Sequence, residues 1–385
     1  MQVYKDKLGC LYTEKDYYRD PSNLNLDLVN FPSEIESLRI EHEDFVASVP
    51  GFMTLEELDS ALQDMNMVSR LYAPKNYSIS RILAENLGDD NFKQVLGLNL
   101  QHLIDGKETK TGGKVIKNVS GYDLSKIYIG SCNSLALINN TYLRLEKNPE
   151  YMAELSLSIP AAVHKNLIDL KFISFLNSLA SIDFDNSLSL GLFFDLSSED
   201  SFSLELRIRL ANSEDLLAIK TKKLTSKLIE FLKDNYSDLN LAQYIKLEKK
   251  IFKKKYPKLE TKLEFHTKLS DLIPLYRRLI ENSKEKNKTL NAENKIRLIV
   301  YPKSSKIELY CPRPILDSWL ESLYSKELPA KFYLRVLPVS FKNKRLERKY
   351  NQSINEYEIK LLRELKSLYD PKGLINPGIL IRDDF

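Results

Sequence analysis

Four of the chain's twelve glycines lie close together, at Gly112, Gly113, Gly121 and Gly130. Glycine allows positive φ angles and lets a flat ligand or a phosphate group approach the main chain. The polar and aromatic residues beside these glycines are Lys117, Asn118, Tyr122 and Asp123. Such a stretch suits a large, planar, phosphorylated ligand, although a pair of tight turns between strands explains the same glycines.

An apolar segment follows the glycine-rich stretch. After Gly130 and Ser131, the residues from Leu135 to Ile138 are apolar, and residues 142–145 continue the pattern. Short apolar runs bounded by turn residues are typical of buried strands. We therefore expect a bent main-chain segment that leads directly into a strand of the core.

The cysteines and histidines give no short metal-binding motif. They are scattered along the chain as Cys10, Cys132 and Cys311, and as His42, His102, His164 and His266. No paired cysteines and no HxH or HExxH spacing occur, which excludes the common zinc and iron–sulfur motifs. Redox chemistry, if the chain performs it, is expected to depend on an organic cofactor.

The composition indicates a globular protein with a sizeable core. The chain has 385 residues, of which 43% are hydrophobic, and its net charge of +4 is too small to favour a nucleic-acid binder. No apolar stretch is long enough to cross a bilayer, and the N-terminus lacks the apolar region of a signal peptide. We expect a cytoplasmic location, with peripheral membrane association through partners left open.

The first third of the chain predicts a strand, a turn and a helix in sequence. Residues 45–49 read as a short strand, and Pro50-Gly51 ends it with a turn. Thr54 followed by Glu57 is a capping-box signature, and leucines at helical spacing follow it to residue 65. Residues 95–105 alternate as a strand does and end at Asp105-Gly106.

The rest of the chain predicts an antiparallel α+β arrangement. Strict alternation over residues 188–210 is typical of a half-buried hairpin. A second hairpin is expected over 295–311, and single strands over 262–269 and 331–338. The helices are expected over residues 213–233, 271–284, 314–325 and 345–368. These elements favour an α+β fold over a doubly wound sheet.

Four segments resemble motifs of one flavoprotein superfamily. Residues 111–124 resemble the TGGxVxKNVxGYDL signature of FAD-linked oxidases, and residues 129–138 resemble their GSxGTLGxI segment. Residues 49–58 are similar to the VxxGxTLxEL unit, and residues 369–378 to the C-terminal FDPxGxxNPG tail. The chain thus resembles the PCMH-type, vanillyl-alcohol-oxidase-like superfamily, in pattern most of all the E subunits of bacterial glycolate oxidase.

This resemblance implies a domain organisation and a cofactor. It implies an N-terminally shortened PCMH-type FAD-binding domain at 1–150, an antiparallel α+β cap domain at 151–340, and a C-terminal helix and tail at 341–385 that packs on the FAD domain. FAD is the implied cofactor, with hydride transfer from a substrate C–H bond to the flavin. The positions that match the family's FAD-contacting segments are Gly112, Gly113, Lys117, Asn118, Gly121, Tyr122, Asp123, Gly130, Ser131, Ser134, Leu135, Ile138 and Asn376. No catalytic residue is assigned.

The sequence departs from the family pattern at several phosphate-binding positions. Residues 1–45 hold one glycine and no GxGT-like loop, Ser80-Arg81 replaces a double glycine, and Asn133 and Ala136 stand where the family has glycine. Arg81 is either a replacement phosphate contact or a solvated helix residue.

Two functions are compatible with these departures. One is an FAD-binding oxidoreductase resembling the glycolate oxidase E subunit, acting on a 2-hydroxy acid with partner flavoprotein or iron–sulfur subunits. The other is a non-catalytic scaffold subunit that has lost FAD. Neither involves nucleic acid or a transmembrane segment.

Three further groups carry alternative interpretations. His164 and His266 are candidates for a general base or a substrate-carboxylate contact, and Arg207 and Arg209 for bidentate carboxylate binding. The lysine-rich run 246–258 is a candidate docking surface for an acidic partner subunit or for anionic lipid. An ordinary surface or packing role is the favoured interpretation of each.

Overall fold

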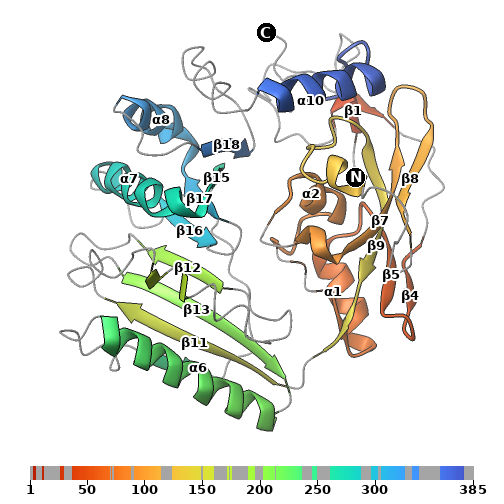
Figure 1. Ribbon diagram of the computed structural model, residues 1–385. Helices are drawn as coiled ribbons and strands as arrows, with labels where there is room; N and C mark the ends of the chain where they lie inside the picture. The colour runs from red at the N-terminus through yellow and green to blue at the C-terminus, as the bar shows by residue number, and fades with distance from the viewer. Residues whose placement is uncertain are drawn as a thin grey trace. The chain divides into compact units, whose positions relative to one another are not determined.

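The computed structural model describes most of the chain's regular elements. The residues described are 3–5, 11–12, 27–29, 37–69, 71, 73–87, 91–113, 124–148, 151–159, 171–172, 174–175, 190–195, 203–212, 214–235, 245–248, 261–287, 296–301, 305–325, 332–337 and 356–376. Two compact units are formed (Figure 1). The first comprises 1–148, 338–340 and 355–385, and the second comprises 149–337 and 341–354.

The first unit contains a five-stranded antiparallel sheet in the order β4-β5-β9-β7-β8. Its strands are β4 (Arg39–Glu41), β5 (Val46–Pro50), β7 (Val95–Gln101), β8 (Glu108–Gly112) and β9 (Leu137–Arg144). Two small antiparallel sheets accompany it: β1 (Val3–Lys5) with β2 (Leu11–Tyr12) and β3 (Asp27–Val29), and β6 (Met67–Val68) with β10 (Glu146–Lys147). The strands predicted at 45–49 and 95–105 are confirmed, the latter with an earlier end at Gln101.

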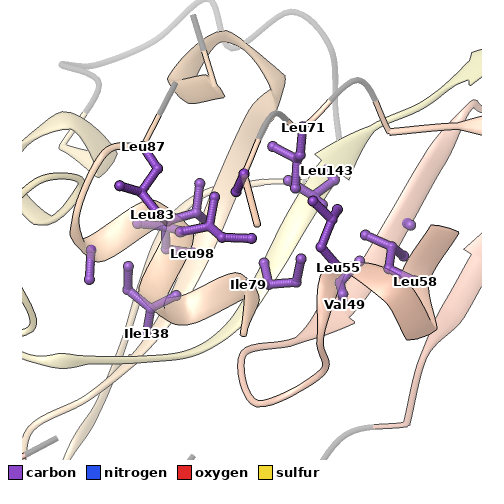
Figure 2. Packing of buried hydrophobic residues seen from close by; sticks show 14 of the residues in the cluster. Val49, Leu55, Leu58, Leu71, Ile79, Leu83, Leu87, Leu98, Ile138 and Leu143 are labelled. Atoms are coloured by element: carbon purple, nitrogen blue, oxygen red, sulfur yellow. The ribbon is translucent and has the colours of Figure 1, made fainter. Parts of the chain in front are cut away.

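Two helices pack on this sheet through leucine and isoleucine side chains. Helix α1 (Leu55–Asp64) begins with the predicted capping box, in which Thr54 and Glu57 each bond the other's main-chain N–H. Helix α2 (Ile79–Ala84) follows after a loop. Figure 2 shows their side chains gathered against strand residues; those labelled include Leu55, Leu58, Ile79, Leu83, Val49, Leu98, Ile138 and Leu143. Burial of such side chains, at about 2 kcal/mol each, holds the helices on the sheet.

Helix α10 (Glu356–Tyr369) belongs to the first unit and precedes the tail. The helix was predicted over 345–368, and the part before Glu356 lies outside the described residues. Its last turn leads to Asp370, whose carboxylate accepts hydrogen bonds from the main-chain N–H groups of Leu374 and Ile375 at 2.9 and 2.8 Å. The predicted Asp370–Gly373 turn is confirmed, with Gly373 at φ +62°.

The second unit contains an eight-stranded antiparallel sheet in the order β14-β11-β13-β12-β16-β17-β15-β18. Its strands are β11 (Tyr151–Ile159), β12 (Leu190–Asp195), β13 (Ser203–Asn212), β14 (Ile245–Glu248), β15 (Thr261–Thr267), β16 (Arg297–Tyr301), β17 (Lys306–Cys311) and β18 (Phe332–Leu337). Both predicted hairpins, β12–β13 and β16–β17, are confirmed. So are helices α6 (Glu214–Asn235), α7 (Leu269–Asn287) and α8 (Leu316–Tyr324), within a few residues at each end.

One face of the second sheet is apolar and packs against a helix. Phe265 of β15 makes an edge contact with Trp319 of α8, with the ring centroids 6.3 Å apart. Leu263 on β15, and Ile307 and Leu309 on β17, are also fully buried. Because side chains alternate along a strand, the residues between them face the other side of the sheet. None of the described helices is long and apolar enough to cross a membrane.

Candidate functional site

A tight loop between α3 (Ser125–Tyr128) and β9 carries half of the described candidate residues. Gly130 has φ +87°, and Cys132 and Asn133 follow in the left-handed region at +52° and +54°. The N–H of Gly130 bonds to the carbonyl oxygen of Leu83 at 3.0 Å, and the N–H of Cys132 to that of Ala84 at 2.9 Å. The loop is therefore fixed against the end of α2, which satisfies two of that helix's terminal carbonyls.

Two departures from the family pattern contact each other here. Asn133, where the family has glycine, directs its Nδ2 at Ser80 Oγ at 3.4 Å, and Ser80 lies in the segment that replaces the double glycine. The Asn133 Oδ1 accepts a hydrogen bond from the N–H of Ile138 at 3.3 Å. Asparagine tolerates the left-handed conformation better than other non-glycine residues. Asn133 therefore stabilises the loop internally and does not project away from it.

Ser134 differs from its neighbour Ser131 in its bonding. The Ser131 hydroxyl donates to the carbonyl of Tyr128 at 2.7 Å, whereas the buried Oγ of Ser134 has no hydrogen-bond partner among the described residues. An unsatisfied buried hydroxyl costs about 1–3 kcal/mol. This hydroxyl lies in the same loop as the positive-φ Gly130, four residues further along the chain. An orphaned buried hydroxyl is compatible with a hydrogen bond to a polar group of a flavin nucleotide.

The C-terminal tail binds the same loop. The Asn376 side chain donates from Nδ2 to the carbonyl oxygen of Cys132 at 3.0 Å. Lys366 Nζ lies 2.7 Å from the carbonyl oxygen of Ser134 and 2.6 Å from that of Ile375, and pairs with the buried Asp370 at 2.8 Å. The ammonium group thus joins α10, the tail and the loop, and the candidate Asn376 lies beside Ser134.

The glycine of β8 has a structural reason of its own. Gly112 has φ +66°, and a Cβ atom there would lie 2.2 Å from the carbonyl oxygen of Leu96. The opposite Gly97 is also crowded, since its Cβ would lie 2.7 Å from the Thr111 oxygen. Glycine is therefore required at Gly112 by the close approach of β7 and β8. Its proximity to a ligand remains a proposal.

Gly113 follows β8, and its N–H bonds to the carbonyl oxygen of Leu96 at 3.2 Å. The other candidates divide into two sets. The side chains of Leu135 and Ile138 are fully buried in the hydrophobic core, as is that of Ala136, so only their main-chain atoms are available to a ligand. The candidates at Lys117, Asn118, Gly121, Tyr122 and Asp123 lie outside the described residues. The structure thus brings the candidates Gly130, Ser131, Ser134 and Asn376 together. A separate contact links β8 to α3, where Thr111 Oγ1 and Ser125 Oγ lie 2.9 Å apart.

An aromatic cluster lies beside the loop. Tyr128 donates from its hydroxyl to that of Tyr369 at 3.2 Å, and His102 stacks on Tyr369 with the centroids 4.9 Å apart. Burial and the Tyr369 contact raise the pKa of Tyr128. Burial lowers the pKa of His102; Lys107 adds to this effect and Asp105 opposes it. Both rings are therefore held in their neutral forms at neutral pH.

Arg81 is not a solvated helix residue, because its side chain is only 12% exposed. Its Nε pairs with Glu85 Oε1 at 2.9 Å, and its guanidinium lies 3.9 Å from the centre of the Tyr77 ring. The neighbouring carboxylate balances the charge that would attract a phosphate. The interpretation of Arg81 as a solvated helix residue is therefore wrong, whereas its interpretation as a phosphate contact stays a prediction.

Sequence reasoning missed several residues that shape this loop. Lys366, Asp370, Ser80 and Tyr369 all contact it or its supports, and none was a candidate. The spacing of Lys366 and Asp370 by four residues, across the start of the tail motif, is the one signal that pointed to a helix-end ion pair.

Comparison with known proteins confirms the resemblance to FAD-linked oxidoreductases. No protein-family profile matches the chain. Among curated proteins, the glycolate oxidase subunit GlcD of Bacillus subtilis is 31% identical over 126 residues, which cover 29% of this chain and 26% of that protein. An FAD-linked oxidoreductase of Mycobacterium tuberculosis is 28% identical over 134 residues, or 33% of this chain and 29% of that protein. The chain therefore aligns with less than a third of the length of either relative.

Solved structures show the same fold over a larger part of the chain. Two crystal forms of alkyldihydroxyacetonephosphate synthase have TM-scores of 0.54 and 0.53, with 11% and 10% sequence identity. Each alignment covers 89% of this chain and 66% of the synthase. At this identity the likeness establishes a shared mixed α/β fold and carries no information on the reaction.

Proposed function

We propose that this chain binds FAD at the Gly130–Ser134 loop and acts as an oxidoreductase subunit of the glycolate-oxidase type. The buried, unsatisfied hydroxyl of Ser134 is the observation that carries the proposal. The similarity of part of the chain to FAD-linked oxidoreductases, one of them named as a glycolate oxidase subunit, supports it. A small 2-hydroxy acid is the proposed substrate, with partner flavoprotein or iron–sulfur subunits as electron acceptors.

The chain's own residues have defined tasks in this proposal. Ser134 Oγ bonds the nucleotide, and Lys366 and Asn376 hold the loop's carbonyl groups so that the hydroxyl keeps its position. Gly112, Gly113 and the segment 117–123 are proposed as further contacts, as is the main chain of Leu135 and Ile138. Bound FAD supplies hydride acceptance. The domain roles proposed are FAD binding for the first unit and substrate binding for the second.

The test is FAD titration of the purified chain, followed by flavin fluorescence and by dialysis. We expect saturable, stoichiometric binding. Ser134→Ala removes one hydrogen bond of about 1 kcal/mol and is expected to weaken FAD binding about fivefold. The same variant removes an unsatisfied buried hydroxyl, so the FAD-free protein is expected to become more stable by about 1 kcal/mol.

Ser367→Ala is the matched control. Ser367 is exposed on α10, in the same unit, and its hydroxyl bonds only within the helix. We expect it to leave both FAD affinity and stability unchanged. Equal FAD affinities for the wild type and Ser134→Ala would remove Ser134 from the site. If FAD binds, reduction of the flavin by glycolate or D-lactate then tests the substrate class.

A scaffold without FAD is the second candidate function. It is favoured by the internal bonding of Asn133 to Ser80 and Ile138, which stabilises the loop without a ligand. It predicts that the purified chain takes up no FAD at any concentration tested, while still forming a complex with partner subunits. The same titration therefore separates the two functions.

A further inference from the structure

The second face of the five-stranded sheet in the first unit is buried but polar. Leu98 and Leu100 of β7 belong to the hydrophobic core, so Asn99 and Gln101, which alternate with them, lie on the opposite face. These two residues are only 6% and 4% exposed. An antiparallel sheet usually has one apolar face on the core and one polar face in water. Two amides that are buried on the face away from the core therefore need an explanation.

The strand register places two more polar residues beside these amides. Asn140 of β9 lies directly opposite Asn99. Its Nδ2 donates a hydrogen bond to the hydroxyl of Ser48 on β5 at 2.9 Å, and both residues are buried. Ser48, Asn140, Asn99 and Gln101 thus form a row of buried polar side chains across three neighbouring strands, here called the amide row. At about 4.8 Å between neighbouring strands, the amide row is about 10 Å wide.

Asn99 and Gln101 each have a buried acceptor that the described part of the chain does not satisfy. The Asn99 Oδ1 and the Gln101 Oε1 have no hydrogen-bond partner among the described residues. An unsatisfied buried acceptor destabilises the folded protein. Each side-chain amide also carries an NH₂ group, so it presents an acceptor and donors next to each other. Two such groups on one face of a strand suit a ligand whose own donors and acceptors lie along one edge.

The surroundings of the amide row favour a neutral and planar ligand. No charged side chain of β5, β7 or β9 is buried. An ion would lose its hydration there without gaining a buried opposite charge. Tyr142 of β9 lies on the same face, opposite Ser48 on one side and Gly97 on the other. An aromatic residue beside amide groups is typical of a site for a planar ring with a polar edge.

The amide row ends one strand away from solvent. The strand next to β7 is β8, which forms an edge of the sheet (Figure 1). Its residues Lys110 and Glu108, which lie opposite Asn99 and Gln101, are exposed. The change from buried to exposed therefore takes place within one strand spacing, about 4.8 Å. A ligand that enters beside β8 meets Asn99 and Gln101 first.

We propose that the amide row binds a neutral, planar heterocycle that has N–H donors next to ring or carbonyl acceptors. The Asn99 Oδ1 and the Gln101 Oε1 accept hydrogen bonds from the N–H groups of the ring, and their NH₂ groups donate to its acceptors. Asn140 and Ser48 are positioning residues that support the row. Adenine and the imide edge of isoalloxazine both have this chemistry, and their choice as probes rests on the proposed FAD binding. The location of the site rests on the geometry of the first unit alone.

The test is calorimetric titration of the full chain with adenosine and, separately, with riboflavin. Neither probe has a pyrophosphate, so the result does not depend on FAD binding at the Gly130–Ser134 loop. We expect saturable binding of at least one probe, and the tighter one identifies the ring. Its analogue that is fully methylated at the amino or imide nitrogen lacks the N–H donor. This analogue is expected to bind at least about fivefold more weakly, the value of one hydrogen bond, to an unaltered protein.

Asn99→Leu and Gln101→Met remove the two unsatisfied amides and keep similar side-chain volumes. Each variant is expected to raise the Tm of the ligand-free chain, because an unsatisfied buried acceptor is lost, and to weaken binding of the ring about fivefold. Gln94→Met is the matched control. The Gln94 Oε1 is also buried without a hydrogen-bond partner among the described residues, but Gln94 precedes β7 and lies outside the amide row. This control is expected to raise the Tm and to leave binding of the ring unchanged.

Ser134→Ala distinguishes this inference from the proposed function. It is expected to weaken FAD binding and to leave the affinity for adenosine or riboflavin unchanged. If FAD does not bind but one of these probes does, the proposed function fails and the amide row stands as a binding site. If neither probe binds, or if methylation of the probe leaves its affinity unchanged, the proposal is overturned. It is also overturned if folded Asn99→Leu and Gln101→Met proteins bind the ring as tightly as the wild type.

Discussion

The Asn376 side chain donates a hydrogen bond to the main-chain oxygen of Cys132 across 244 residues of sequence, at 3.0 Å. Both residues have positive φ angles, +41° and +52°, although neither is glycine. The tail and the loop are thus each held in a conformation that the isolated chain segment disfavours. Their mutual bond offsets part of that cost and fixes the carbonyl of Cys132, two residues before Ser134.

Replacing Asn376 tests this bond directly. Asn376→Ala is expected to cost about 1–2 kcal/mol of backbone strain and about 1–3 kcal/mol for the lost hydrogen bond to a buried carbonyl. Asn66→Ala is the matched control, because Asn66 has φ +54° but is exposed. Hydrogen exchange of the peptides around Cys132 and Asn376 is the measurement. If Asn376→Ala and Asn66→Ala lower the protection of these peptides against hydrogen exchange equally, the hydrogen bond between Asn376 and Cys132 contributes nothing.

Lys366 is expected to be the strongest single link between α10 and the loop. Lys366→Met leaves the fully buried Asp370 carboxylate without its ion pair and frees the carbonyls of Ser134 and Ile375. Breaking a buried pair from one side costs about 3–5 kcal/mol. Chemical unfolding monitored by circular dichroism should show this loss. Lys372→Met, at an exposed position of the tail, should leave the unfolding curve unchanged.

Two glycines with nearly the same φ angle separate conformational strain from steric contact. Gly106 and Gly112 have φ +69° and +66°, but a Cβ at Gly106 meets nothing within 4 Å. Gly106→Ala is expected to cost about 1 kcal/mol, the ordinary cost of the left-handed conformation. Gly112→Ala is expected to cost about 1–3 kcal/mol more, because its Cβ would overlap the Leu96 oxygen. If Gly106→Ala and Gly112→Ala lose similar free energies of unfolding in thermal unfolding experiments, this account of Gly112 is contradicted.

His102 is expected to make the first unit less stable in mild acid. Its pKa in the folded protein is lowered, chiefly by burial, from the ordinary value of about 6.5. As the pH falls below that value, His102 becomes protonated in the unfolded chain but stays neutral in the folded protein. Unfolding therefore becomes more favourable. The contribution of neutral His102 to the free energy of unfolding is complete above about pH 6.5 and decreases below that pH.

The measurement for His102 is the free energy of unfolding at about pH 7.5 and about pH 5.5. His102→Gln should reduce the difference between the two values, whereas His42→Gln, at an exposed position, should not. An unchanged pH dependence in His102→Gln would show that the stacked imidazole is protonated as readily in the folded protein as in the unfolded chain.

Local sequence patterns predicted most of the regular elements correctly. The capping box at Thr54, both hairpins of the second sheet and helix α7 depend on residues close together in the sequence, and all are confirmed. The motif resemblance identified the class of flavoproteins with which the chain shares part of its sequence. The same patterns placed Gly130 and Ser134 in one loop, because three intervening residues leave the chain little freedom.

Contacts between distant segments were decided only by the tertiary structure. The sequence gives no reason to pair Asn133 with Ser80, Lys366 with the oxygen of Ser134, or Glu264 with Glu308, since 44 residues or more separate the members of each pair. It also presented Gly112 as a ligand contact, where the approach of Leu96 already requires glycine. Periodicity and capping specify elements because their energies are local. Which polar groups are buried together depends on strand register and helix packing, which the whole fold determines.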